Sequence, residues 1–158
     1  KVQGNPAYMT NQTSSDIEQG SPYANLIING TFDTDSDWSK QTGWSIANGV
    51  ASSVASGNGQ DLQQSVGGKI ISGKTYKVEY TISNHVTGGV KTFLSGGGAV
   101  QGNTNTANGT YIDYLTAPAN NTTFKFTTAD GGFTGSVDNV TVEEVNTGLQ
   151  GYWRLCYW

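Results

Sequence analysis

The most regular alternation of apolar and polar residues lies between positions 75 and 83. Tyr76, Val78, Tyr80 and Ile82 occupy every second position, and polar residues lie between them. Successive side chains of a β-strand point to opposite faces of its sheet, so this spacing predicts a strand with one buried face.

Shorter segments of the same kind follow one another through residues 25–145. We predict further strands at 26–28, 44–50, 61–66, 90–94, 111–116, 122–127 and 137–145. Turns rich in Gly and Asn separate them, and Asn48-Gly49 is typical of a tight hairpin turn. About eight short strands without a helical pattern between them predict an all-β fold, an antiparallel β-sandwich of the jelly-roll type.

Both ends of the chain differ from this pattern. Residues 1–24 have no apolar period and carry Pro6 and Pro22. They predict an extended arm or linker, or alternatively an arm that orders against a partner or a neighbouring subunit.

Residues 146–158 form a C-terminal segment in which aromatic residues predominate at the end. Its composition is that of interface anchors, which favour Trp, Tyr and Arg. We predict that it docks on a sister subunit or another protein, and the alternative is that it covers an edge of its own sheet. The anchor residues are Tyr152, Trp153, Arg154, Leu155, Tyr157 and Trp158.

The composition supports an all-β domain and excludes several kinds of function. Gly accounts for 22 of the 158 residues and charged residues for 13%, which disfavours helices. The net charge of −4 and the scattered lysines argue against nucleic-acid binding, which needs a basic surface. A single Cys excludes an internal disulfide framework. No apolar run is long enough for a membrane span.

Catalytic motifs are missing from the sequence as well. Glycoside hydrolysis needs two carboxylates that face each other across a cleft, and none of the acidic residues stands in a recognisable acid/base motif. The only histidine, His85, falls in an expected loop with no serine elbow nearby. We predict a domain without enzymatic activity.

Three segments of residues 25–145 resemble a known class of domain. NLIINGTFD, GKTYKVEYTIS and FTGSVDNVTVEEV are similar to the jelly-roll carbohydrate-binding modules of xylanases and other glycanases. NGTFDTDSDWSKQTGWSIANGVA resembles more closely a version that recurs in tail, fibre and capsid-associated proteins of tailed bacteriophages. For the glycanase modules the resemblance implies a β-sandwich, sugar binding on a concave sheet face and often a structural Ca²⁺.

Two functions follow as expectations from this resemblance. The first is a non-catalytic virion domain of a tailed phage, for decoration or a fibre, displayed on the virion surface. It would contact other virion proteins or sister subunits and could adhere to surface glycans. The alternative is a carbohydrate-binding module of a secreted polysaccharide-degrading enzyme.

The acidic loop at Asp33, Asp35 and Asp37 has the oxygen-ligand spacing with which a calcium loop begins. An EF-hand is excluded because Trp38 stands where its turn glycine is needed. The resemblance implies a different site for one structural Ca²⁺, at Asp33 and Asp138, with Asp33 in place of the usual Glu. The alternative is a solvated acidic turn, with Asp138 bonded to backbone amides.

Sugar recognition requires exposed aromatic rings together with amides and hydroxyls. The aromatic candidates are Trp38, Tyr111 and Tyr114, and the alternative for a single aromatic residue is core packing. The expected polar partners are Asn84, Gln63, Asn103 and Asn105. Trp44 and Tyr76 alternate with aliphatic residues and are expected in the core.

Overall fold

The computed structural model describes residues 24–54 and 57–145, and every regular element in these ranges is a β-strand. The strands are β1 (Ser39–Lys40), β2 (Trp44–Ala47), β3 (Val50–Ser53), β4 (Asp61–Ile70), β5 (Thr75–Ser95), β6 (Val100–Gln101), β7 (Gly109–Thr116) and β8 (Asn121–Glu144). All pairs between them are antiparallel, as predicted. The described ranges contain no helix long and apolar enough to cross a membrane.

Two predicted features lie outside the described residues. These are residues 1–23 of the N-terminal arm and the whole docking segment 146–158 with its aromatic anchors. Both remain predictions.

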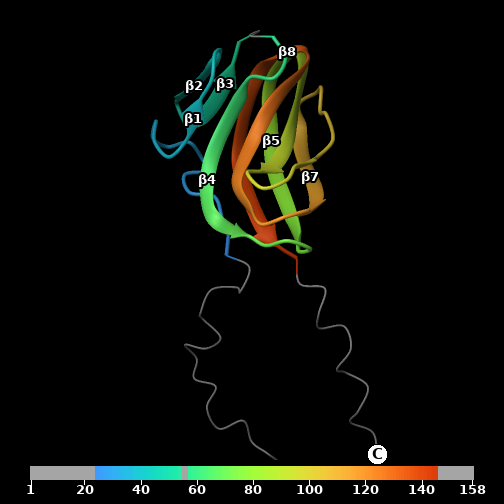
Figure 1. The fold of residues 1–158 in the computed structure, drawn as a ribbon. Helices are drawn as coiled ribbons and strands as arrows, with labels where there is room; N and C mark the ends of the chain where they lie inside the picture. Colours follow the sequence, from blue (N-terminus) through green and yellow to red (C-terminus); the bar gives the residue numbers. More distant parts are fainter. Residues whose placement is uncertain (1–23, 55–56, 146–158) are drawn as a thin grey trace, which may run out of the picture.

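The two longest strands, β5 and β8, each fold back on themselves. Ile70 of β4 pairs with Asn121 at the start of β8, and Tyr76 of β5 pairs with Glu144 at its end. Ile71 N donates a 2.8 Å hydrogen bond to Tyr76 Oη, which holds these two places together. The two ends of the 24-residue strand β8 therefore lie at the same end of the sandwich, so the strand must reverse its direction midway (Figure 1).

The reversal takes place at glycines where the two strands touch. Gly88 has a φ of 71°, and Asp130, Gly131 and Gly132 also have positive φ. A Cβ atom on Gly88 would lie 1.7 Å from the Gly132 carbonyl oxygen, so only glycine allows this approach. The predicted separate strands 75–83 and 90–94 are one strand, as are 122–127 and 137–145, because both partners bend together and continue their pairing.

This folding gives the molecule two halves that share β5 and β8 (Figure 1). The first half has the order β1, β4, β8 (121–129), β5 (89–95) and β6. The second half has the order β2, β3, β8 (134–144), β5 (75–87) and β7. Strands that pass from one sheet to another through bends are a known way to form the corners of a sandwich. The predicted jelly-roll class is confirmed.

The core lies between the inner faces of the halves. Tyr76, Val78, Tyr80 and Ile82 are buried at 0–1% exposure, which confirms the alternation that predicted this strand. The Asn48-Gly49 hairpin between β2 and β3 is also confirmed.

The first predicted strand is wrong. Residues 26–28 form no strand, although Leu26 N donates to the Val142 carbonyl at 2.8 Å. The side chain of Gln64 replaces a strand partner: its amide donates to the Ile28 carbonyl, and its carbonyl accepts from Ile28 N, both at 2.8 Å. Side-chain hydrogen bonds thus satisfy the backbone here without a ladder.

Candidate functional site

A straight row of side chains crosses the outer face of the first half. Phe93 pairs with Gln101 on one side and Lys125 on the other, Lys125 pairs with Gln63, and Gln63 pairs with Ser39. Directly paired residues of antiparallel strands lie on the same face of the sheet. We call these five residues the Phe93 row.

Phe93 lies on the outside because of its place in the alternation of β5. Val90, Thr92 and Leu94 are fully buried, whereas Lys91 and Phe93 are half-buried. An aromatic residue out of phase with the buried positions must face away from the core.

Two lysine side chains flank the Phe93 ring. Lys125 Nζ is 5.1 Å from the ring centroid and Lys91 Nζ is 5.3 Å from it. Both distances fall in the range of cation–π attraction. The ring therefore lies close to two positive charges on the surface of the sheet.

Asp61 fixes one of these lysines. Lys125 Nζ donates to Asp61 Oδ2 at 2.7 Å, and the Thr127 hydroxyl donates to Asp61 Oδ1 at 2.6 Å. Asp61 is only 9% exposed, and a buried carboxylate needs such partners. Lys91 makes no ion pair in residues 24–54 and 57–145.

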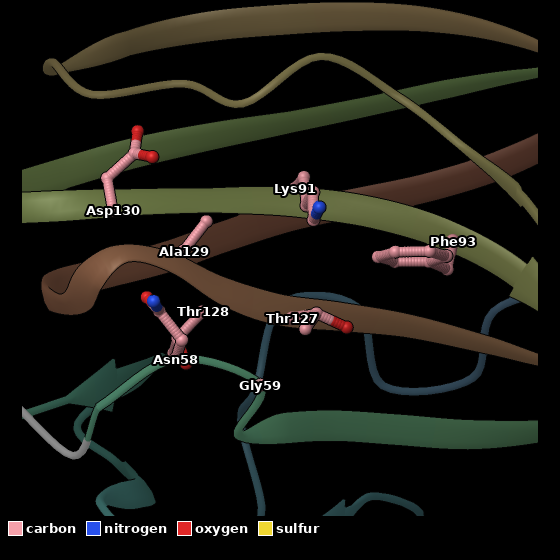
Figure 2. Close-up of a pocket in the computed structure, with 8 residues that line it drawn as sticks. All are labelled: Asn58, Gly59, Lys91, Phe93, Thr127, Thr128, Ala129 and Asp130. Carbon is pink, nitrogen blue, oxygen red and sulfur yellow. The ribbon is translucent and has the colours of Figure 1, made fainter.

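An open pocket of about 350 Å³ adjoins the row. Figure 2 shows Phe93 at one end, Asp130 at the other and Lys91 between them. The side-chain carbonyl of Asn58 accepts a 2.8 Å hydrogen bond from Gly131 N, and this bond orients the Asn58 side chain at the pocket wall. The pocket thus combines an aromatic ring with an ammonium group, an amide and a hydroxyl from Thr127.

A second open pocket, of about 480 Å³, lies where β6 meets β7. Tyr114, 64% exposed, lines it together with Asn103 and Asp113. The buried Asp113 carboxylate accepts hydrogen bonds from the Thr92 hydroxyl at 2.7 Å and from Asn103 N at 3.2 Å. Asp113 therefore has a structural role, and Tyr114 is an exposed aromatic residue of this pocket.

The expectation that Trp38 offers a free ring face is wrong. Trp38 is 6% exposed, and its indole N–H donates to the Asn29 carbonyl at 3.1 Å. Its ring packs 5.2 Å from Phe32 and 6.5 Å from Phe126. Asp37, with a φ of 66°, turns the chain before it, so Trp38 points into the core.

The structure does not bring the remaining predicted ligand residues together. Tyr111 lies on the inner side of β7, with its ring 5.8 Å from Tyr80, whereas Tyr114 lies on the outer side. Gln63 belongs to the Phe93 row, and Asn84 is exposed on β5 near the reversal. The five residues therefore do not form a single surface.

Asn103 and Asn105 bond within the protein. Asn103 Nδ2 donates to Asp113 Oδ1 at 3.3 Å, and Asn105 Nδ2 donates to Tyr80 Oη at 2.6 Å. Asn103 nevertheless lines the second pocket, whereas the Asn105 amide supports the core.

The segments that carry Asp33 and Asp138 lie next to each other. Val140 N donates to the Gly30 carbonyl at 2.9 Å, which joins the loop before Asp33 to β8 just after Asp138. Carboxylates suit Ca²⁺, but within the described chain no three Asp, Glu, His or Cys side chains form a cluster that could hold a metal. Asp138 accepts a 2.6 Å hydrogen bond from Asn139 N. The Ca²⁺ site remains a prediction.

Sequence reasoning missed Phe93, Lys91 and Lys125 as site residues. The signal was present in the segment 90–94, where an aromatic residue falls on the polar positions of the alternation. The register that places Lys125 beside Phe93 joins residues far apart in sequence, so no local pattern contains it.

No protein-family model matches the chain, and no curated protein is significantly similar to it in sequence. Solved structures are similar in fold. A CBM4 structure shares 18% identity at a TM-score of 0.51, over 75% of this chain and 99% of that one. A mutant of the family 29 carbohydrate-binding module CBM29-2, complexed with cellulohexaose, shares 14% identity at a TM-score of 0.53, over 77% and 89%.

A virion protein has a similar fold as well. The enzymatically active domain of tailspike protein 4 of bacteriophage CBA120 shares 18% identity at a TM-score of 0.52, over 79% of this chain and 22% of that one. Identities this low establish only that the chain has the fold of a carbohydrate-binding module.

Proposed function

We propose that this chain is a non-catalytic carbohydrate-binding domain and that the Phe93 row, with its adjoining pocket, is the binding face. The observation that carries the proposal is the outward Phe93 ring, set among hydrogen-bonding groups at an open pocket. An aromatic ring can pack against the apolar face of a sugar, while amides and hydroxyls bond its hydroxyl groups.

The row provides these groups on both sides of the ring. Gln101 lies on one side, and Gln63 and Ser39 lie beyond Lys125 on the other. A row that crosses every strand of the half suits an extended ligand such as a polysaccharide chain better than a single small molecule.

The described residues that line each pocket include too few acids for glycoside hydrolysis. Among the described residues, Asp130 is the one carboxyl group that lines the pocket beside Phe93, and Asp113 is the one that lines the second pocket. Both retaining and inverting glycosidases use a pair of carboxyl groups across the scissile bond. This supports binding without cleavage in these two pockets.

The fold is compatible with this function. A mutant of a carbohydrate-binding module with a similar fold was solved in complex with cellulohexaose, a sugar chain. We therefore propose that this chain acts on a surface where glycans are accessible, outside the cell or on a particle.

The setting in which the domain acts is a second proposal. The similarity to a bacteriophage tailspike domain and the resemblance of residues 29–51 to phage proteins favour a virion protein that decorates a particle or forms part of a fibre. Other virion proteins or sister subunits would then be its partners. The alternative setting is a secreted polysaccharide-degrading enzyme that carries this domain as its binding module.

Affinity electrophoresis on a panel of polysaccharides tests the binding face. Phe93→Ala should reduce retention at least tenfold, with the melting temperature close to that of the wild type because the ring lies outside the core. Tyr114→Ala tests the second pocket in the same gels. Loss of retention with Tyr114→Ala and not with Phe93→Ala would contradict the proposed face.

A further inference from the structure

The two lysines beside Phe93 differ in their electrostatic state. Lys125 is neutralised by Asp61, whose carboxylate is 2.7 Å away. Lys91 makes a cation–π contact with Phe93 and has no ion pair in the described part of the chain. A chain with a net charge of −4 thus presents an uncompensated positive group at its binding face.

We infer that the Phe93 face, by which we mean the Phe93 row with its adjoining pocket, binds an anionic saccharide. The Lys91 ammonium then contacts a carboxylate or sulfate group of the sugar that packs on Phe93. This inference rests on the proposed function and names the chemical class of its ligand.

Covering Lys91 with a ligand has an energetic cost. A sugar packed on Phe93 would remove water from the adjacent Lys91 ammonium, and burying a charge without a partner is unfavourable. A neutral ligand offers only hydroxyl groups in compensation, whereas an anionic group forms a stronger, charge-assisted hydrogen bond. The attraction also increases as the sugar lowers the local dielectric constant.

The charges along the pocket determine where an anionic group can lie. In Figure 2, Asp130 is at the end opposite Phe93, and Lys91 lies between them. An anionic group beside Asp130 would be repelled, so it should lie between Lys91 and Phe93. Lys125 is held by Asp61, whose other carboxylate oxygen accepts from the Thr127 hydroxyl, so Lys125 is less available than Lys91.

Lys77 provides a matched control on the same strand. It also faces outward from β5, but on the second half of the sandwich, and its Nζ is 2.5 Å from Glu79 Oε2. Lys77→Gln therefore removes the same charge from the protein as Lys91→Gln but leaves the Phe93 face unchanged.

The test compares acidic and neutral forms of the same polymer by affinity electrophoresis. One pair of probes is polygalacturonate and its carboxyl-reduced form, and the other pair is dextran sulfate and dextran. The wild-type chain should bind at least one acidic polymer about tenfold more tightly than its neutral counterpart. Lys91→Gln should remove most of this difference, Lys77→Gln should preserve it, and added salt should weaken the binding.

The outcomes separate this inference from the proposed function. Equal binding to acidic and neutral polymers would contradict the inference that the ligand is anionic. A preference for acidic polymers that survives Lys91→Gln would contradict it as well. If Phe93→Ala still abolished binding in that case, carbohydrate binding at this face would stand. If the wild-type chain bound none of the four probes, the inference of an anionic ligand would be wrong. A broader panel of neutral polysaccharides would then test the proposed carbohydrate binding by itself.

Discussion

The Tyr80 ring lies edge-on to the Phe126 ring, with the ring centroids 5.1 Å apart and the planes at 71°. Tyr80 belongs to β5 of the second half and Phe126 to β8 of the first, so this contact joins the inner faces of the sandwich. Edge-to-face pairs add about 0.5–1.5 kcal/mol to the gain from burial.

The Tyr80 hydroxyl predicts a pH-dependent stability. Burial raises the pKa of Tyr80 above its ordinary value of 10.0, although the hydrogen bond from Asn105 opposes this shift. As the pH rises, the unfolded chain therefore loses the Tyr80 proton before the folded chain does. The stabilisation of the folded state by the protonated Tyr80 is complete below pH 10 and is lost as the pH rises further. Urea unfolding between pH 8 and 11 should show a shallower fall in the free energy of unfolding for Tyr80→Phe. An unchanged slope would contradict this.

Trp38→Ala should destabilise the domain strongly because Trp38 is in the core. Truncation of a buried aromatic ring costs about 3–5 kcal/mol, and Trp38→Phe should cost less. Urea denaturation of both variants measures the difference. Wild-type stability of Trp38→Ala would show that the ring is not a core residue.

A pair of glycine variants tests the reversal of β5. Gly88 and Gly73 have similar φ values, 71° and 78°, but a Cβ on Gly73 would meet no atom within 4 Å. Gly73→Ala should cost about 1–2 kcal/mol from its left-handed backbone alone. Gly88→Ala adds a clash with the Gly132 carbonyl oxygen and should cost about 1–3 kcal/mol more. Equal costs in thermal unfolding would mean that the two strands do not touch there.

Asp61→Asn should destabilise the first half. The substitution removes the negative charge of the carboxylate, which accepts a hydrogen bond from Lys125 Nζ at 2.7 Å and another from the Thr127 hydroxyl. Hydrogen bonds to charged groups contribute about 1.5–3 kcal/mol each, and denaturant titration would measure the loss. Thr127→Val, which removes only the neutral donor, should cost less. The reverse order would show that the ion pair contributes little.

Calcium at Asp33 and Asp138 is open to a direct test. An ion that binds only the folded state stabilises it, so millimolar CaCl₂ should raise the melting temperature and a chelator should lower it. Asp138→Asn should abolish the response. A melting temperature that is insensitive to both additions would eliminate the site.

The alternation in 75–83 was sufficient to predict which side chains of that strand are buried, because the period of two is a local property. The reversal at Gly88 could not be predicted, since it depends on contact with Gly132 in a strand distant in sequence. The same applies to Trp38, whose direction is set by the left-handed Asp37 before it. The Phe93 row arises from strand register, which only the complete sheet determines.

The hydrogen bond from Leu26 N to the Val142 carbonyl holds the first described residues beside the last part of β8. The described chain starts and finishes at one pole of the sandwich (Figure 1). Neighbouring ends permit a domain to be inserted into a surface loop of another protein, or to be circularly permuted, with little strain on the host. The sandwich can thus be inserted as a unit at one position in a surface loop of a host protein.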